Sequence, residues 1–79
     1  MSGDRDPLDL VRVDTARLDA AVEASGLGIG RLSRRTGIDR GGLHRLRRRG
    51  SAIWRTVQRL AEVLGVDPAS LLATEEPSP

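Results

Sequence analysis

The sequence predicts an all-α fold, a compact bundle of about five short helices that forms one domain. Its 79 residues leave room for one small domain, since domains usually run to roughly 100–200 residues. Apolar residues recur at the three- and four-residue spacing of a helix face, not in the alternation of a strand. Glycines follow these periodic segments, as expected where a helix ends in a left-handed residue.

The folded domain is expected to span residues 10–73, between two flexible tails. Residues 1–9 and 74–79 are polar and rich in acids and proline, which is typical of a solvated terminus. Residues 10–13 (LVRV) alternate weakly between apolar and polar, but four residues are too few to predict a strand. The sequence therefore predicts no strand.

Each expected helix has a start or stop signal of its own. Asp14 is suited to cap the first helix, and Gly26 to end it. The fourth helix has the clearest amphipathic pattern, because its apolar residues are spaced 0, 3, 4 and 7. Pro68 suits the first position of a last helix of one to two turns, which holds Leu71 and Leu72. The first four helices are expected at about 15–25, 29–36, 40–49 and 53–64.

The second and third expected helices form a helix-turn-helix arrangement. They are joined by a turn of about three residues that contains a glycine. Leu43 and Leu46, spaced i, i+3, are the only apolar residues of the third helix and define its buried side. Arg45 and Arg48 then lie on the opposite, outward side of that helix.

The positive charge of the chain is concentrated in its middle. All 13 cations are arginine, although the formal net charge is only +2. Residues 31–59 hold ten arginines and one acid, whereas residues 1–30 and 60–79 are both net acidic. A biased composition would explain the absence of lysine but not this segregation. A basic centre favours an anionic partner, and arginine binds phosphate and guanine bidentately.

The outward side of the third helix is predicted to read base edges of double-stranded DNA. An α-helix fits the major groove, where the first residues of a recognition helix usually meet the bases. Base contacts are predicted for Arg40, Gly41 and Arg45. Gly41 either lets the backbone approach a base pair or, together with Gly42, only delays the start of the helix.

Further basic side chains are predicted to contact phosphates. The last three arginines of the third helix also suit its dipole, but three in a row exceed what a dipole needs. Trp54 is expected either to pack against the preceding loop or to donate its indole N–H to a phosphate. The predicted phosphate contacts are Arg31, Arg34, Arg35, His44, Arg47, Arg48, Arg49 and Arg55.

The residue content excludes several other kinds of site. The absence of cysteine excludes disulfides and thiolate zinc sites, and a single histidine, His44, excludes a paired-histidine metal site. The serines have no accompanying base, so we expect neither an enzyme nor a cofactor or small-molecule substrate. No apolar run approaches the ~20 residues that span a bilayer, and no secretory signal is evident. A cytoplasmic protein associated with the nucleoid, and not with a membrane, is expected.

Two stretches carry a family resemblance, by spacing more than by identity: LGIGRLSRRTGIDRGGLHRLRRRG and TVQRLAEVLGVDPASLL. Over residues 14–72 the chain resembles the phage-repressor/Cro-like (XRE-type) helix-turn-helix family of bacterial and phage regulators. The resemblance implies a lambda-repressor-like bundle that dimerises and places its third helix in the major groove. It also implies base reading at Arg40, Gly41 and Arg45, and phosphate contacts near Ile29, Arg48 and the start of the fourth helix.

The chain departs from this family at two places. Gly28 and Ile29 stand where members often have Ser or Thr followed by Gln, which removes a cap and a phosphate contact. Arg47 stands where members commonly have an acid. This reversal predicts that an internal brace is absent and that non-specific affinity for DNA rises.

The sequence therefore predicts a sequence-specific, double-stranded DNA-binding transcriptional regulator, acting as a repressor. The alternative is a protein-interaction module, such as an antitoxin or an adaptor, that binds an acidic protein partner. A homodimer is expected. The apolar residues least needed inside one protomer either form its interface or seal the core; they are Leu8, Leu10, Val11, Leu71 and Leu72.

Overall fold

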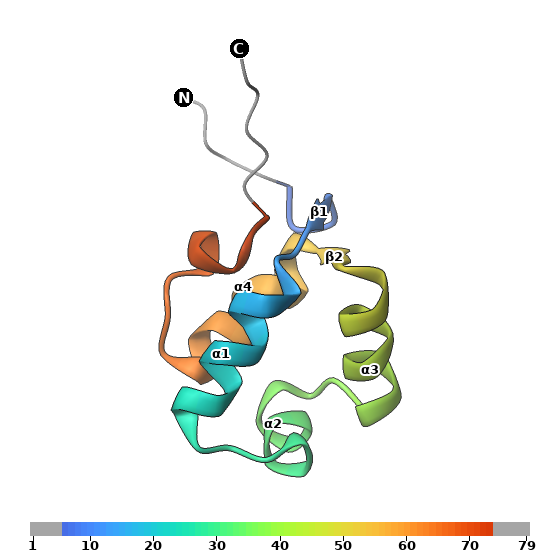
Figure 1. Cartoon of the computed structure of the whole chain (residues 1–79). Coiled ribbons are helices and arrows are strands. Elements are labelled where there is room, and N and C mark those ends of the chain that lie inside the picture. The colour runs from blue at the N-terminus through green and yellow to red at the C-terminus, as the bar shows by residue number, and fades with distance from the viewer. Residues whose placement is uncertain (1–5, 74–79) are drawn as a thin grey trace.

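Four α-helices, a short 3-10 helix and two short strands make up residues 6–73, which is the part of the chain that the computed structural model describes (Figure 1). The short helix η1 follows α4 and packs against both α4 and α1. The elements, in chain order, are β1 (Leu10–Arg12), α1 (Thr15–Ser25), α2 (Ile29–Thr36), α3 (Arg40–Arg49), β2 (Ser51–Ile53), α4 (Trp54–Leu64) and η1 (Pro68–Leu71).

The prediction of a small, mainly helical fold is confirmed, but the fold is not strictly all-α. Strands β1 and β2 pair antiparallel, with Leu10 opposite Ile53, Val11 opposite Ala52 and Arg12 opposite Ser51. The alternation in residues 10–13 was therefore a genuine strand signal. A three-residue strand is too short to be recognised alone, and its partner is distant in the sequence.

The expected fifth α-helix is a single 3-10 segment, so the bundle has four α-helices within residues 6–73. Asp67 caps this segment by accepting a hydrogen bond from the Ala69 N–H at 3.1 Å. At Leu72 the chain is already extended and forms an antiparallel bridge with Val13. This bridge ends the helix after one turn, because Leu72 cannot pair as a strand and remain helical.

Residues 6–9, which the sequence places in the N-terminal tail, are bonded to the start of α4. The Asp9 carbonyl accepts from the Trp54 N–H and the Pro7 carbonyl accepts from the Arg55 N–H, both at 2.8 Å. The side chain of Ile53, at the N-cap position of α4, is apolar and cannot accept a hydrogen bond from these amides. Two amides at the helix start are thus satisfied by backbone instead. The rest of the predicted tails, residues 1–5 and 74–79, lie outside the described residues.

A single buried cluster holds the helices together. Every α-helix contributes to it, as do Val13, which directly follows strand β1, and Leu71 of η1. Because α3 contributes two leucines, its rotation about its own axis is fixed by the core. The members are Val13, Leu18, Leu32, Leu43, Leu46, Val57, Leu60, Ala61, Leu64 and Leu71.

The turn between α2 and α3, residues 37–39, is held by two hydroxyl groups. The buried Thr36 hydroxyl donates to the Leu32 carbonyl at 2.7 Å and accepts from the Ile38 N–H at 3.2 Å. The Ser33 hydroxyl donates to the Ile38 carbonyl at 2.6 Å. These bonds fix the turn from both sides, and so they fix the position of α3 relative to α2.

No helix within residues 6–73 combines the length and the apolar character needed to cross a membrane.

Candidate nucleic-acid interface

The third helix buries its two leucines and exposes its charged side chains. Leu43 is 2% exposed and Leu46 is 5% exposed. The residues predicted to read bases, Arg40, Gly41 and Arg45, are all exposed. All eight residues predicted to contact phosphates are exposed as well. The separation of apolar and basic sides that the sequence predicts is therefore present in the fold.

Arg40 lies against the first turn of α2. One terminal nitrogen of its guanidinium group, Nη2, is 3.2 Å from the point that a Cβ atom on Gly30 would occupy. The glycine leaves the space that the guanidinium group fills. Arg40, the first residue of α3, therefore packs against the beginning of α2. The sequence gives no direct signal for this role of Gly30.

The two glycines at the start of α3 have different roles. The helix begins at Arg40, so the glycines do not delay its start. A Cβ atom on Gly42 would lie 3.1 Å from both Asp39 Oδ1 and Ile38 Cγ2, so glycine there permits close packing of the turn. Gly41 is open, and only the Arg45 guanidinium group (Nη1, at 3.7 Å) and Asp39 come near its missing Cβ. On the outward side of α3, the Arg45 guanidinium group thus lies near the backbone of Gly41, which carries no side chain.

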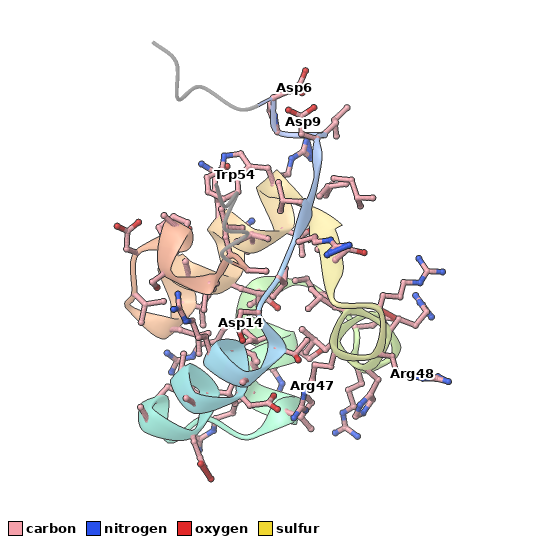
Figure 2. The ribbon with its side chains drawn as sticks, turned by 45° about the horizontal axis from the view of Figure 1, so that its top comes forward. Asp6, Asp9, Asp14, Arg47, Arg48 and Trp54 are labelled. Atoms are coloured by element: carbon pink, nitrogen blue, oxygen red, sulfur yellow. The ribbon has the colours of Figure 1, made fainter. Side chains whose placement is uncertain are left out.

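Arg47 differs from the other arginines of α3 because it is bound to α1. Its Nη2 atom is 2.7 Å from Asp19 Oδ1, and both side chains are about half exposed. Figure 2 shows Arg47 directed toward α1, whereas Arg48 points away from the body of the molecule. The usual brace of the family, which needs an acid at this position, is expected to be absent; here the reversed charge pairs instead with Asp19 on α1. Exposed pairs of this kind contribute about 0–1 kcal/mol.

Apart from Arg47, the arginines of the basic surface within residues 6–73 are not paired with a carboxylate. Within residues 6–73 the structure has two ion pairs, Arg17 with Asp14 and Arg47 with Asp19. No other arginine of this part of the chain has a carboxylate partner within 4.0 Å. Figure 2 also shows Asp6 and Asp9 gathered near Trp54, away from Arg48. Within residues 6–73, the other arginines of this surface are therefore not neutralised by a paired carboxylate.

The basic surface continues from α3 onto α4. One hollow lies between α3 and the start of α4 and is lined by Arg45, Arg49, Ile38 and Thr56. A neighbouring hollow of about 350 Å³ shares Ile38 and Thr56 with the first. Two arginines of α4, Arg55 and Arg59, also line this second hollow, together with one acid, Glu62. The sequence analysis missed Arg59, although its place one turn after Arg55 on the polar side of α4 could have indicated it.

At the start of α4 side chains are available to an anion, but the first two backbone amides of the helix are not. The amides of Trp54 and Arg55 already donate to backbone carbonyls of residues 7–9. The side chain of Arg55 is exposed at this point and is not used in these bonds. Trp54 is partly buried and packs against the core cluster, whereas the sequence predicts packing against the preceding loop.

Within residues 6–73 no group of three or more His, Cys, Asp or Glu side chains could hold a metal ion.

Comparisons of the chain with protein-family models, with curated proteins and with solved structures found no match. The function proposed below is therefore supported by the residues and the fold of this chain alone.

Proposed function

We propose that the protein is a sequence-specific, double-stranded DNA-binding regulator that acts as a repressor by inserting α3 into the major groove. The observation that carries this proposal is that α3 has a buried apolar side and an exposed basic side. It buries two leucines and exposes five arginines, of which Arg47 alone has a carboxylate partner within residues 6–73. A single α-helix fits the major groove, and an arginine fork matches the O6 and N7 atoms of guanine. The regulator would work on the chromosome, in the cytoplasm.

Sequence choice would come from the first half of α3. Arg45, which lies near the open backbone of Gly41, would bind a guanine edge directly. Arg40, at the junction of α2 and α3, would bind a second base edge. Gly41 would let the helix lie close to the floor of the groove, since a side chain at this position would point toward the bases.

Affinity would come from the arginines around α3. Arg31, Arg34 and Arg35 on α2 would contact one flank of the groove, and Arg48 and Arg49 the other. His44 and Arg55 add two further donors. Arg47 can reach a phosphate only by leaving Asp19, so we assign it the smallest share of the affinity. Each phosphate that is neutralised releases a counterion, which makes the affinity dependent on salt.

The proposal predicts strongly salt-dependent binding of duplex DNA. With about six phosphates contacted, log K should fall against log salt with a slope of about −5. Fluorescence anisotropy with a random duplex and with duplexes selected from a random pool would measure the slope and the preference. A slope near zero would contradict the proposal. Tight binding to an acidic protein, without any binding to DNA, would favour the interaction-module interpretation instead.

We also propose that the regulator is a homodimer whose interface includes the exposed end of the β1–β2 ribbon. Leu8 and Leu10 are 63% and 72% exposed and are the large apolar side chains left in solvent within residues 6–73. Leu71 is 2% exposed and seals the core, so it is removed from the set of interface residues that the sequence predicts.

Leu10→Asp is expected to convert the dimer to a monomer without changing the melting curve of the protomer. The introduced charge would have to be desolvated at the interface, whereas it costs little at an exposed site of the monomer. Sedimentation velocity at micromolar concentration checks the mass, and circular dichroism checks the fold. If the wild-type protein sediments as a strict monomer without DNA, this interface does not exist.

A further inference from the structure

The pairing of β1 with β2 brings an arginine from the acidic N-terminal third of the sequence to the basic helix. The ribbon lies beyond the C-terminal end of α3, because β2 follows α3 after the single residue Gly50 (Figure 1). In the register of the ribbon, Arg12 stands opposite Ser51, two residues after Arg49. The sequence analysis assigned no role to Arg12.

The backbone around Arg12 is held on both sides, and its side chain faces outward. Its carbonyl accepts from the Ala73 N–H at 3.0 Å, and the next residue, Val13, donates to the Gly50 carbonyl at 2.9 Å. Side chains alternate along a strand. Since Val13 is buried and Val11 packs on the core, Arg12 is directed to the opposite face, where it is exposed.

Arg12 and Arg49 line one open hollow. Its other lining residues are Gly50, Ser51 and Ala73 and, from β1 and the residue after it, Leu10, Val11 and Val13. No acidic residue within residues 6–73 lines this hollow. The Gly50 carbonyl, which would otherwise present negative charge at the end of α3, is occupied by the Val13 N–H. Among the residues that the structure describes, the site thus offers two guanidinium groups and no competing carboxylate.

The position of the hollow suits the backbone of a duplex whose bases α3 reads. An α-helix rises 1.5 Å per residue, so Arg49 lies roughly 13 Å along the helix from Arg40. The major groove is only about 12 Å wide. A helix whose first turn meets base edges and whose axis runs obliquely across the groove therefore carries its last turn to the phosphates that border it.

We propose that Arg12 and Arg49 together form a binding site for a phosphodiester group, which docks the β1–β2 ribbon on the DNA backbone beside the reading helix. This inference rests on the proposed function. The ribbon would fix how deeply α3 lies in the groove without contributing any choice of sequence, because a phosphate is the same at every base pair.

The test compares Arg12→Ala with Arg17→Ala, which removes the same charge from the exposed side of α1. Arg12→Ala is expected to weaken binding about 5- to 10-fold at ~0.1 M salt, and to reduce the magnitude of the salt slope by about 1. Preferred and random duplexes should lose the same factor. Arg17→Ala should change neither quantity, and Arg12→Lys should restore the slope. Circular dichroism, together with Arg12→Gln as a second variant, separates a loss of contact from a loss of fold.

A neutral methylphosphonate, placed singly along the duplex, locates the contact. Where it replaces the phosphate that contacts Arg12 and Arg49, it should weaken DNA binding by the wild-type protein and leave DNA binding by Arg12→Ala unchanged. If Arg12→Ala behaves like Arg17→Ala while the wild-type slope stays near −5, the ribbon site is wrong and the proposed function stands. If the wild-type protein binds no duplex at all, the proposed function fails and this site fails with it.

Discussion

Replacing Leu43 with alanine is expected to remove most of the stability of the protein. Leu43 is 2% exposed and is one of only two side chains that anchor α3 in the core. A buried leucine truncated to alanine costs about 2–5 kcal/mol, through lost transfer energy and the cavity left behind. A core of this size rarely supplies more than ~3–5 kcal/mol in total. The variant should therefore be largely unfolded at room temperature, as urea titration followed by circular dichroism would show.

Gln58→Ala also truncates a side chain to alanine, but at an exposed position of α4, and serves as the control. Surface substitutions usually change stability by less than about 0.5 kcal/mol. Equal losses in the two variants would mean that Leu43 does not face the core. The outward direction of Arg45 would then lose its basis, because the buried leucines are what set the rotation of α3.

Replacing Arg45 with alanine is expected to remove discrimination at one base pair of the preferred site. A bidentate contact between arginine and guanine is worth about 1–3 kcal/mol against the wrong base. The variant should therefore bind the preferred duplex roughly 5- to 150-fold more weakly and become tolerant of substitution at that position. Competition titrations with single-base variants of the selected duplex would measure both effects.

Arg48→Ala is the matched control for Arg45→Ala, since it removes the same side chain from the same helix. Arg48 points away from the molecular body, one turn nearer to the end of α3 (Figure 2). Its loss should weaken every duplex by a similar factor and reduce the salt slope by about 1. If Arg45→Ala gave this uniform pattern too, Arg45 would be a phosphate contact and another residue would read the base.

The bounds of the helices could be predicted from the sequence because the signals that end them are local. Each α-helix ends at a glycine in the left-handed conformation, Gly26, Gly37, Gly50 or Gly65. The periodic leucines of α3 and α4 likewise predict their own burial. From these two kinds of signal the exposed side of α3, and with it the main part of the candidate interface, follows directly.

The features that the sequence did not reveal all depend on contacts between distant parts of the chain. The pairing of residues 10–12 with residues 51–53 joins segments about 40 positions apart, and neither has a strong strand signal alone. The ion pair of Arg47 with Asp19 depends on how α3 packs beside α1. Arg12 enters the basic surface only through the ribbon, so nothing in its local sequence indicates a binding role.

The bonds from residues 7–9 to the start of α4 also bear on how far this protein can be shortened. A fragment cut at residue 10, where the sequence alone would place the edge of the domain, loses the carbonyls of Pro7 and Asp9 and frees two amides of α4. That helix supplies four of the ten buried apolar side chains. The minimal autonomous unit therefore starts no later than Pro7. A purification tag is better attached through a spacer that leaves the bonds of residues 7–9 to α4 undisturbed.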